Sequence, residues 1–228
     1  MKRTTTKRIK EYDVAKGIGI LLVVIGHALP TDSYWRVFIY SFHMPLFFFL
    51  SGLVMKDATL ITIKESFLEE KKLIASYLFW SALYLAFDVF VKFLILKTIS
   101  VNILFWHIYQ TVTLFGISVL WFLASLILGK VITKCIAIIF KTDEARLLVA
   151  IVIFTISSIA AYFMPQIESG AMRLVYYPIA TIIRTVLMSS FIIFGYSVRN
   201  NIPLLIEKVK ILSGGGGTAQ SRLHCYCF

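Results

Sequence analysis

Residues 15–30 read AKGIGILLVVIGHALP, an apolar run that carries Lys16 near its start and His27 near its end. A membrane-spanning helix needs about 20 mostly apolar residues, and this run approaches that length. A charged side chain at the bilayer centre costs roughly 2.5–3.5 kcal/mol on insertion scales. We therefore predict a span over 14–30 whose two polar side chains face protein or a water-filled cavity rather than lipid.

The rest of the chain continues this apolar pattern. Of its 228 residues, 59% are hydrophobic, which is typical of membrane proteins and not of soluble domains. Five further apolar runs are long enough to cross a bilayer: 35–55, 74–96, 118–140, 147–164 and 176–198. The sequence thus predicts an all-α, polytopic transmembrane bundle of about six spans. Asp88 and Lys92 are four residues apart in the third span and are expected to pair on one face of it.

The basic residues predict an orientation. With the N-terminus in the cytosol, fourteen Lys and Arg residues fall in inner segments and three fall in outer loops, namely Arg36, Lys97 and Arg173. Such a bias favours an orientation in which both termini lie on the cytosolic side of the cell membrane. Topology therefore explains the net charge of +11, and no nucleic-acid partner is expected.

The composition changes after Leu212. Residues 1–212 are predicted to form the membrane domain. The segment 213–228 starts with SGGGG and has no apolar run, so we expect a disordered or non-native tail. In that tail His224 precedes a Cys-x-Cys pair that lacks a second pair of ligands, so no metal and no bound cofactor are expected.

Helical geometry relates Lys16 to His27. Eleven residues return to nearly the same helix face, about 20° away, and rise about 16 Å. Gly19 and Gly26 lie on or near that side, where small residues let another backbone or a ligand come close. We expect this face of the first span to point into the bundle.

The second span, FHMPLFFFLSGLVMK, adds polar groups of its own at His43, Ser51 and Gly52. Counted from the inner surface, His27 and His43 both lie about 20 Å up their antiparallel helices. We therefore expect the two imidazoles to flank one cavity. Ser51 and Gly52 should lie lower, near the level of Lys16.

These residue types suit a proton-transfer site with an anion-binding entrance. Histidine can take a proton from a hydroxyl near neutral pH, and a lysine near the inner surface suits a phosphate-bearing ligand from the cytosol. Each has a simpler explanation as well. His27 can be a structural hydrogen-bond partner, Lys16 can extend its amine to the inner surface, and His43 can sit at the outer interface.

The motifs resemble those of the membrane-bound acyltransferase 3 family. Lys16-x10-His27 is similar to the family's basic-x10-His motif, and FFFLSGLVMK to its Ser-Gly motif in the second helix. The longer FHMPLFFFLSG resembles the branch that O-acetylates sugars, including fucose acetylase-like enzymes. Weaker matches are KKLIASYLFW, LWFLASLI with Trp121, and FGYSVRN, so that the resemblance covers about residues 8–205.

The resemblance implies transfer of an acyl group, usually acetyl, from cytosolic acetyl-CoA to a hydroxyl of an extracytoplasmic glycan. It implies that His27 is the base or acyl relay and that Lys16 supports the CoA side or the cavity. The helix depths given above add His43 to the catalytic set. The remaining residues implied to bind substrate or donor are Ser51, Gly52, Lys71, Lys72 and Trp121. Membrane lipid, acyl-CoA and a carbohydrate acceptor are the implied partners.

Two departures from the family pattern bear on activity. Glu69 and Glu70 interrupt the basic signature before Lys71. Family members have about ten spans, so we expect this chain, with about six, to insert but to be inactive alone. Alternatives are a non-catalytic membrane carrier or assembly subunit with a polar pocket, and an incomplete product of a longer gene.

Overall fold

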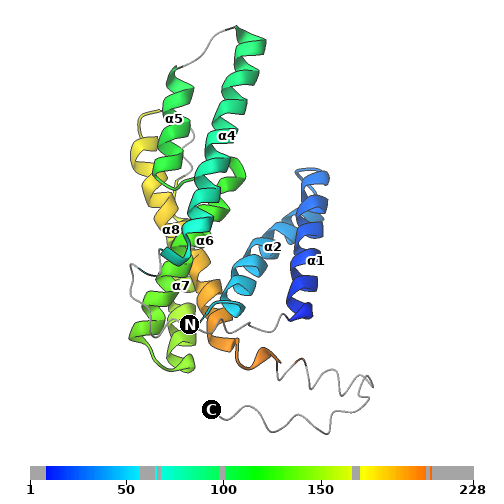
Figure 1. Ribbon diagram of the computed structural model, residues 1–228, viewed down its shortest axis with the longest axis vertical. Helices are drawn as coiled ribbons and strands as arrows, with labels where there is room; N and C mark the ends of the chain where they lie inside the picture. Colours follow the sequence, from blue (N-terminus) through cyan, green and yellow to red (C-terminus); the bar gives the residue numbers. More distant parts are fainter. Residues whose placement is uncertain are drawn as a thin grey trace.

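The computed structural model describes residues 9–56, 65, 68–97, 101–165, 170–203 and 206. Within these ranges the chain is helical and has no strand, so the predicted all-α fold is confirmed (Figure 1). The predicted tail, 213–228, lies outside the described residues. The elements are α1 (Lys10–Ala28), α2 (Tyr34–Leu53), α4 (Lys71–Leu96), α5 (Val101–Val112), η1 (Ser118–Leu120), α6 (Trp121–Ile139), α7 (Asp143–Tyr162) and α8 (Arg173–Val198).

In the part of the chain that the structure describes, five of the six predicted spans have helices long and apolar enough to cross a bilayer. They are α2, α4, η1 with α6, α7 and α8. The α1 helix falls outside this group because it begins at Lys10 and so includes Glu11, Asp13 and Lys16 within its 19 residues. The chain is a multi-pass membrane protein, and its first helix is the most polar of its long helices.

Helix α5 was not predicted, because its 12 residues are too short to cross a bilayer. It lies against α4, where His107 Nε2 is 3.0 Å from Asp88 Oδ2. The same carboxylate oxygen accepts a hydrogen bond from Lys92 Nζ at 2.7 Å. The predicted Asp88–Lys92 pair is therefore confirmed, and it has a third member from the neighbouring helix.

Helix α8 occupies the centre of the bundle and packs against α2, α6 and α7 (Figure 1). Its contact with α2 depends on two glycines. A Cβ at Gly52 would collide with the Ile192 carbonyl oxygen, and a Cβ at Gly195 would collide with the Phe49 carbonyl oxygen. Small residues allow such backbone contact, which stabilises helix pairs in membranes through van der Waals packing.

The turn from α6 to α7 is closed by Thr142 and Arg146. The Thr142 hydroxyl caps α7 by accepting from the Ala145 amide at 3.3 Å. The buried Arg146 donates from Nε to the Phe140 carbonyl at 2.8 Å and from Nη1 to Asp143 at 2.7 Å. These bonds satisfy polar groups at both helix ends and fix the turn.

Candidate active site

Two histidines flank one tyrosine where α1 packs on α2. The ring centroids of His27 and Tyr40 are 5.7 Å apart, and those of Tyr40 and His43 are 5.1 Å apart. Both imidazoles thus lie beside the same tyrosine ring, and the cavity that they were expected to flank stays a prediction. Sequence reasoning missed Tyr40, although it lies three residues before His43 and thus near the same face of α2.

The two imidazoles differ in exposure but share one hydrogen-bond pattern. His43 is 3% exposed, whereas His27 is exposed. Each ring places Nδ1 at 2.8 Å from a carbonyl oxygen one helical turn earlier, that of Val23 for His27 and of Ile39 for His43. A carbonyl can only accept, so Nδ1 carries the hydrogen and Nε2 of the neutral ring carries the lone pair. Both rings are thereby set up to accept a proton at Nε2.

The predicted role of the α1 glycines in close approach is also present. A Cβ at Gly26 would lie 2.9 Å from Tyr40 Cε1, and one at Gly19 would lie 2.9 Å from Phe47 Cζ. Both distances are shorter than ordinary carbon contacts. The glycines therefore let α2 aromatic rings pack directly on the α1 backbone, and Gly26 brings Tyr40 beside His27.

Arg36 adds a cation to this group that the sequence analysis counted only as an outer-loop charge. Its guanidinium lies 5.2 Å from the Tyr40 ring centroid, and Nη1 donates to the Leu29 carbonyl at 3.3 Å. Leu29 follows the last residue of α1, so this bond ties the end of α1 to the start of α2. The spacing Arg36–Tyr40–His43 on one helix is the signal that could have predicted the cluster.

The other predicted residues of α1 and α2 lie away from the two histidines. Lys16 is half-buried, eleven residues before His27 on the same helix. Gly52 is buried against the α8 backbone, with a Cβ there only 2.8 Å from the Tyr196 nitrogen. Its neighbour Ser51 is half-buried. The structure thus gives Gly52 a helix-packing role, and Ser51 is the member of the pair that retains partial exposure.

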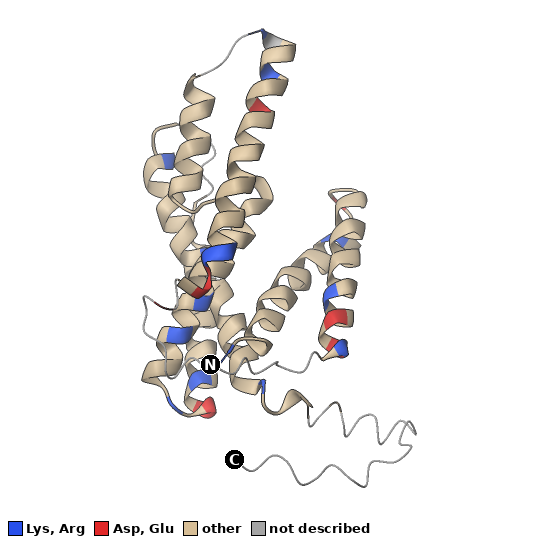
Figure 2. Ribbon diagram, viewed as in Figure 1, with Lys and Arg blue, Asp and Glu red and all other residues tan. Residues whose placement is uncertain are grey.

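Lys71 and Lys72 are both exposed in the first turn of α4. The acidic residues before them point elsewhere, toward α6. Lys134 Nζ donates to Glu69 at 2.8 Å, and Lys130 Nζ donates to Glu70 at 3.0 Å. Figure 2 shows both signs of charge close together at the start of α4.

The negative charges of the two glutamates that interrupt the basic signature are therefore neutralised by ion pairs within the bundle. Glu69 and Glu70 pair with lysines of α6, while the side chains of Lys71 and Lys72 are exposed.

Trp121 lies at the start of α6, beside Arg184 of α8, which was not among the predicted site residues. The Arg184 guanidinium is 4.8 Å from the Trp121 ring centroid and 5.0 Å from the Phe115 ring centroid. Trp121 is half-buried. Among the described residues, the contacts place the predicted residues in separate groups: His27 and His43 beside Tyr40, Lys71 and Lys72 at the start of α4, and Trp121 beside Arg184.

Residues 9–217 match the acyltransferase domain of the acyltransferase 3 family. The chain belongs to this family. The match covers α1 to α8 and includes every residue named above as a candidate.

Two curated relatives of this acyltransferase 3 member are nodulation proteins. NolL of Mesorhizobium japonicum is 38% identical over 94 residues, which is 35% of this chain and 24% of the relative. NolL of Sinorhizobium fredii is 38% identical over 84 residues, which is 32% of this chain and 23% of the relative. The matched part thus spans about a quarter of either relative. No solved structure matches the chain.

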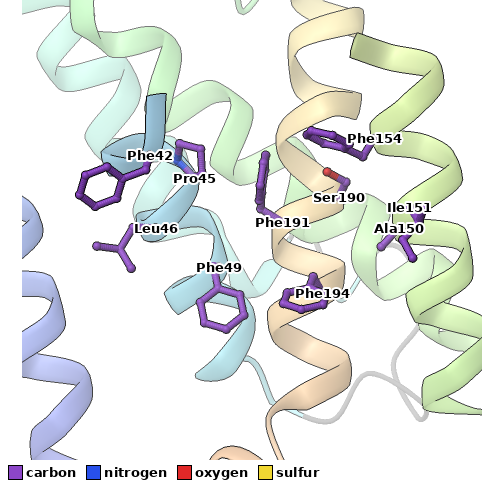
Figure 3. Close-up of a pocket in the computed structure, with 10 residues that line it drawn as sticks. All are labelled: Phe42, Pro45, Leu46, Phe49, Ala150, Ile151, Phe154, Ser190, Phe191 and Phe194. Atoms are coloured by element: carbon purple, nitrogen blue, oxygen red, sulfur yellow. The ribbon is translucent and has the colours of Figure 1, made fainter. Parts of the chain in front are cut away.

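An apolar groove of about 480 Å³ lies on another side of this acyltransferase 3 domain (Figure 3). It is lined by Phe42, Pro45, Leu46, Phe49, Ala150, Ile151, Phe154, Ser190, Phe191 and Phe194. These residues belong to α2, α7 and α8, and the lining includes no imidazole, carboxylate or ammonium group. Its chemistry fits hydrocarbon and not proton transfer.

The ion pairs at the start of α4 predict a pH dependence of stability. The hydrogen bond from Lys134 holds the pKa of Glu69 below its ordinary value of 4.5. A carboxylate with a lowered folded-state pKa contributes stability above its unfolded-state pKa, and this is lost as pH falls through the folded-state pKa. We therefore expect the contribution of Glu69 to the thermal midpoint of the purified protein to be constant above pH 4.5 and to be lost progressively as the pH falls below that value.

The matched variant is Glu69→Gln, which keeps the shape and removes the titration. Its midpoint should be lower than that of the wild type near neutral pH, and the two should converge as the pH is lowered. The pH range from 3 to 6 includes 4.5, the ordinary pKa of this carboxyl group. If the plots of thermal midpoint against pH for the two proteins were parallel over this range, this role for Glu69 would be contradicted.

Proposed function

We propose that this chain provides the histidine-bearing part of a membrane O-acyltransferase. The acyl group, acetyl in the simplest case, comes from cytosolic acyl-CoA and goes to a hydroxyl of an extracytoplasmic glycan. The observation that carries the proposal is the pair His27 and His43 on either side of Tyr40, each with Nδ1 held by a carbonyl. Membership of the acyltransferase 3 family supports the reaction class.

The proposed chemistry takes place at His27 Nε2. The Val23 carbonyl holds Nδ1–H, so Nε2 is available to accept the proton of the acceptor hydroxyl. The hydroxyl oxygen then attacks the thioester carbonyl carbon, the carbon–sulfur bond breaks, and the departing thiolate takes the proton from Nε2. In the relay version Nε2 itself accepts the acyl group and then passes it to the hydroxyl.

The donor is proposed to reach this site from the end of α1 that carries Lys16. With the N-terminus in the cytosol, Lys16 and the exposed Lys71 and Lys72 lie on the cytosolic side. Ammonium groups bind phosphates as point charges, and acyl-CoA carries several phosphates. Ser51 is proposed to line the path between the two sides.

The chemistry proposed at His27 requires more protein around this side chain than α2 provides. His27 is exposed, and α1 packs mainly on α2. Acyl transfer to a glycan needs exclusion of water, which would otherwise hydrolyse the thioester. We therefore propose that residues 1–228 insert into a membrane and bind donor, and that efficient transfer needs additional protein surface beside α1.

A photoreactive acyl-CoA analogue tests donor binding by this chain directly. Membranes containing residues 1–228 should crosslink the probe when it is added from the cytosolic side, and unlabelled acetyl-CoA should compete. The second candidate function, a non-catalytic carrier with a polar intramembrane path, rests on the polar groups of α1 and α2. It predicts no crosslink that acetyl-CoA can displace, and that outcome would overturn the acyltransferase proposal.

The Lys16→Met variant should weaken donor binding and leave acceptor binding unchanged. The substitution keeps the apolar length of the side chain and removes the ammonium group, so helix insertion should improve if it changes at all. The measurement is the acetyl-CoA concentration that halves crosslinking, which should rise about tenfold for loss of one phosphate contact. In an active family member, a Michaelis constant raised only for the acceptor would contradict this placement.

A further inference from the structure

Three buried polar atoms without hydrogen-bond partners belong to the facing sides of α6 and α8. They are Ser125 Oγ on α6, and Thr185 Oγ1 and Arg184 Nε on α8, judged against the described residues. Ser125 is 0% exposed and Thr185 is 2% exposed. Buried polar groups almost always bind protein, water or a ligand. These three atoms therefore need a partner that the described residues do not supply, which is either water or a ligand.

Neighbouring hydroxyls on the same helices do not share this property. Thr133 on α6, and Thr181 and Ser189 on α8, each donate to a carbonyl within one turn of their own helix, at 2.7–2.8 Å. That is the usual way for a helix in a membrane to satisfy a hydroxyl. Ser125 and Thr185 depart from the pattern, so their hydrogens remain available to another group.

The two hydroxyls lie at the same level of the interface. Because α7 returns the chain between them, α6 and α8 run in the same direction (Figure 1). Trp121 contacts Arg184 at one level, and a Cβ on Gly129 would lie 3.6 Å from Ser189 Cα at the level below. Ser125 lies midway between Trp121 and Gly129 in sequence, and residue 185 lies between Arg184 and Ser189. Both hydroxyls therefore lie between these two contacts.

Arg184 supplies a positive charge to this part of the interface. Its Nη2 donates to the Phe115 carbonyl at 2.7 Å, and its guanidinium lies beside the rings of Phe115 and Trp121. No carboxylate of the described residues lies within 4.0 Å of it. An arginine inside a membrane domain is costly without a counter-charge, so its retention points to an anionic partner. Arg184 is only half-buried, so an anion can reach its guanidinium from outside the bundle.

We propose that Arg184, Ser125 and Thr185 form a binding site for an anionic group, a carboxylate or a phosphate, on a ligand. The planar guanidinium presents parallel N–H groups that match two oxygens of such a group, and each hydroxyl can donate one further hydrogen bond. The rings of Phe115 and Trp121 exclude water around the charge, which strengthens the interaction. The site uses neither histidine, so it can be tested without acyl transfer.

The test is ligand-induced thermal stabilisation of purified residues 1–228 in detergent at constant chloride. Sodium glucuronate supplies a carboxylate, sodium phosphate supplies a phosphate, and glucose is the neutral control. A ligand that binds only the folded state raises the midpoint, and near-saturating anion should raise it by at least about 3 °C. Glucose should cause no shift. A shift with either anion supports the site and identifies which anionic group it prefers.

Matched arginine variants assign the effect. Arg184→Met should abolish the anion-dependent shift. Arg173→Met should retain it, although Arg173 also belongs to α8 and stacks on an indole, 3.8 Å from the Trp106 centroid. Equal shifts in wild type and Arg184→Met would overturn the proposal. The absence of any anion-dependent shift in the wild type would also overturn the proposal, since the three unpartnered polar atoms would then bind water only.

A double variant keeps the test decisive if Arg184→Met fails to fold. Ser125→Ala combined with Thr185→Val removes both hydroxyls and keeps the charge and the volume. Its apparent dissociation constant for the anion should rise at least about tenfold, the equivalent of one or two hydrogen bonds to a charged group. A folded double variant with unchanged anion affinity would exclude these hydroxyls and overturn the site.

Discussion

Replacing His27 by alanine should lower acyl transfer by about 10²- to 10⁴-fold, the range expected for loss of a general base. The measurement belongs in an active family member with the same basic-x10-His motif. The physical reason is the orientation of the ring, since the Val23 carbonyl holds Nδ1–H and leaves Nε2 to take the proton. Folding should be little affected, because His27 is exposed and the substitution removes a polar group from a helix.

The control for this variant is Val24→Ala, which truncates another exposed side chain of α1. Its turnover should stay near that of the wild type, and both variants should reach the membrane in similar amounts. Near-normal turnover in the His27 variant would leave the histidine with a structural role only.

The Gly52→Ala variant should lose much of its stability. The added methyl group meets the carbonyl oxygen of Ile192, and a backbone atom cannot rotate out of the way as a side chain can. Overpacking of a helix contact typically costs about 1–3 kcal/mol, and a backbone collision belongs at the upper end. For a chain of this size the thermal midpoint in detergent should fall by about 5–10 °C.

Gly17→Ala is the matched control for Gly52→Ala. Gly17 is also a helical glycine, but nothing lies within 4 Å of a Cβ placed there. Alanine in a helix interior is favoured over glycine by about 0.5–1 kcal/mol, so this variant should be neutral or slightly more stable. If both variants have the same midpoint, α2 and α8 are not in the close contact described, and Gly52 becomes free for the ligand-binding role first expected of it.

The spans could be predicted because hydrophobic length is a local property. The helices of the third, fourth and fifth spans begin or end within a few residues of their predicted limits. Helix α5 was missed for the same reason, since 12 residues carry no length signal. The polar start of α1 was underestimated because the apolar run was counted from residue 14, whereas the helix begins at Lys10.

Depth along the helices predicted contacts between them only approximately. Counting residues from the membrane surface predicted His27 and His43 at one level, and both lie within 6 Å of the Tyr40 ring centroid. Because Gly26 faces Tyr40 and Gly19 faces Phe47, however, His43 lies about one helical turn deeper than His27. Rotation about a helix axis is set by packing, so the facing of Glu69 toward Lys134, 65 residues later, could not be predicted. The role of Gly52 in the contact with α8 was hidden for the same reason.

The central position of α8 determines when the bundle can assemble. During synthesis the chain emerges from its N-terminal end, and α8 begins roughly 120 residues after α2 ends. At about 5–20 residues per second, α2 waits in the bilayer for on the order of ten seconds before its main partner exists. In that interval the surface of α2 around Gly52, which later packs on α8, is exposed to lipid or to other newly made helices. A chaperone or insertase that shields this face would act on α2 before α8 arrives, and a ribosome stalled within α7 would leave a product with no centre to pack around.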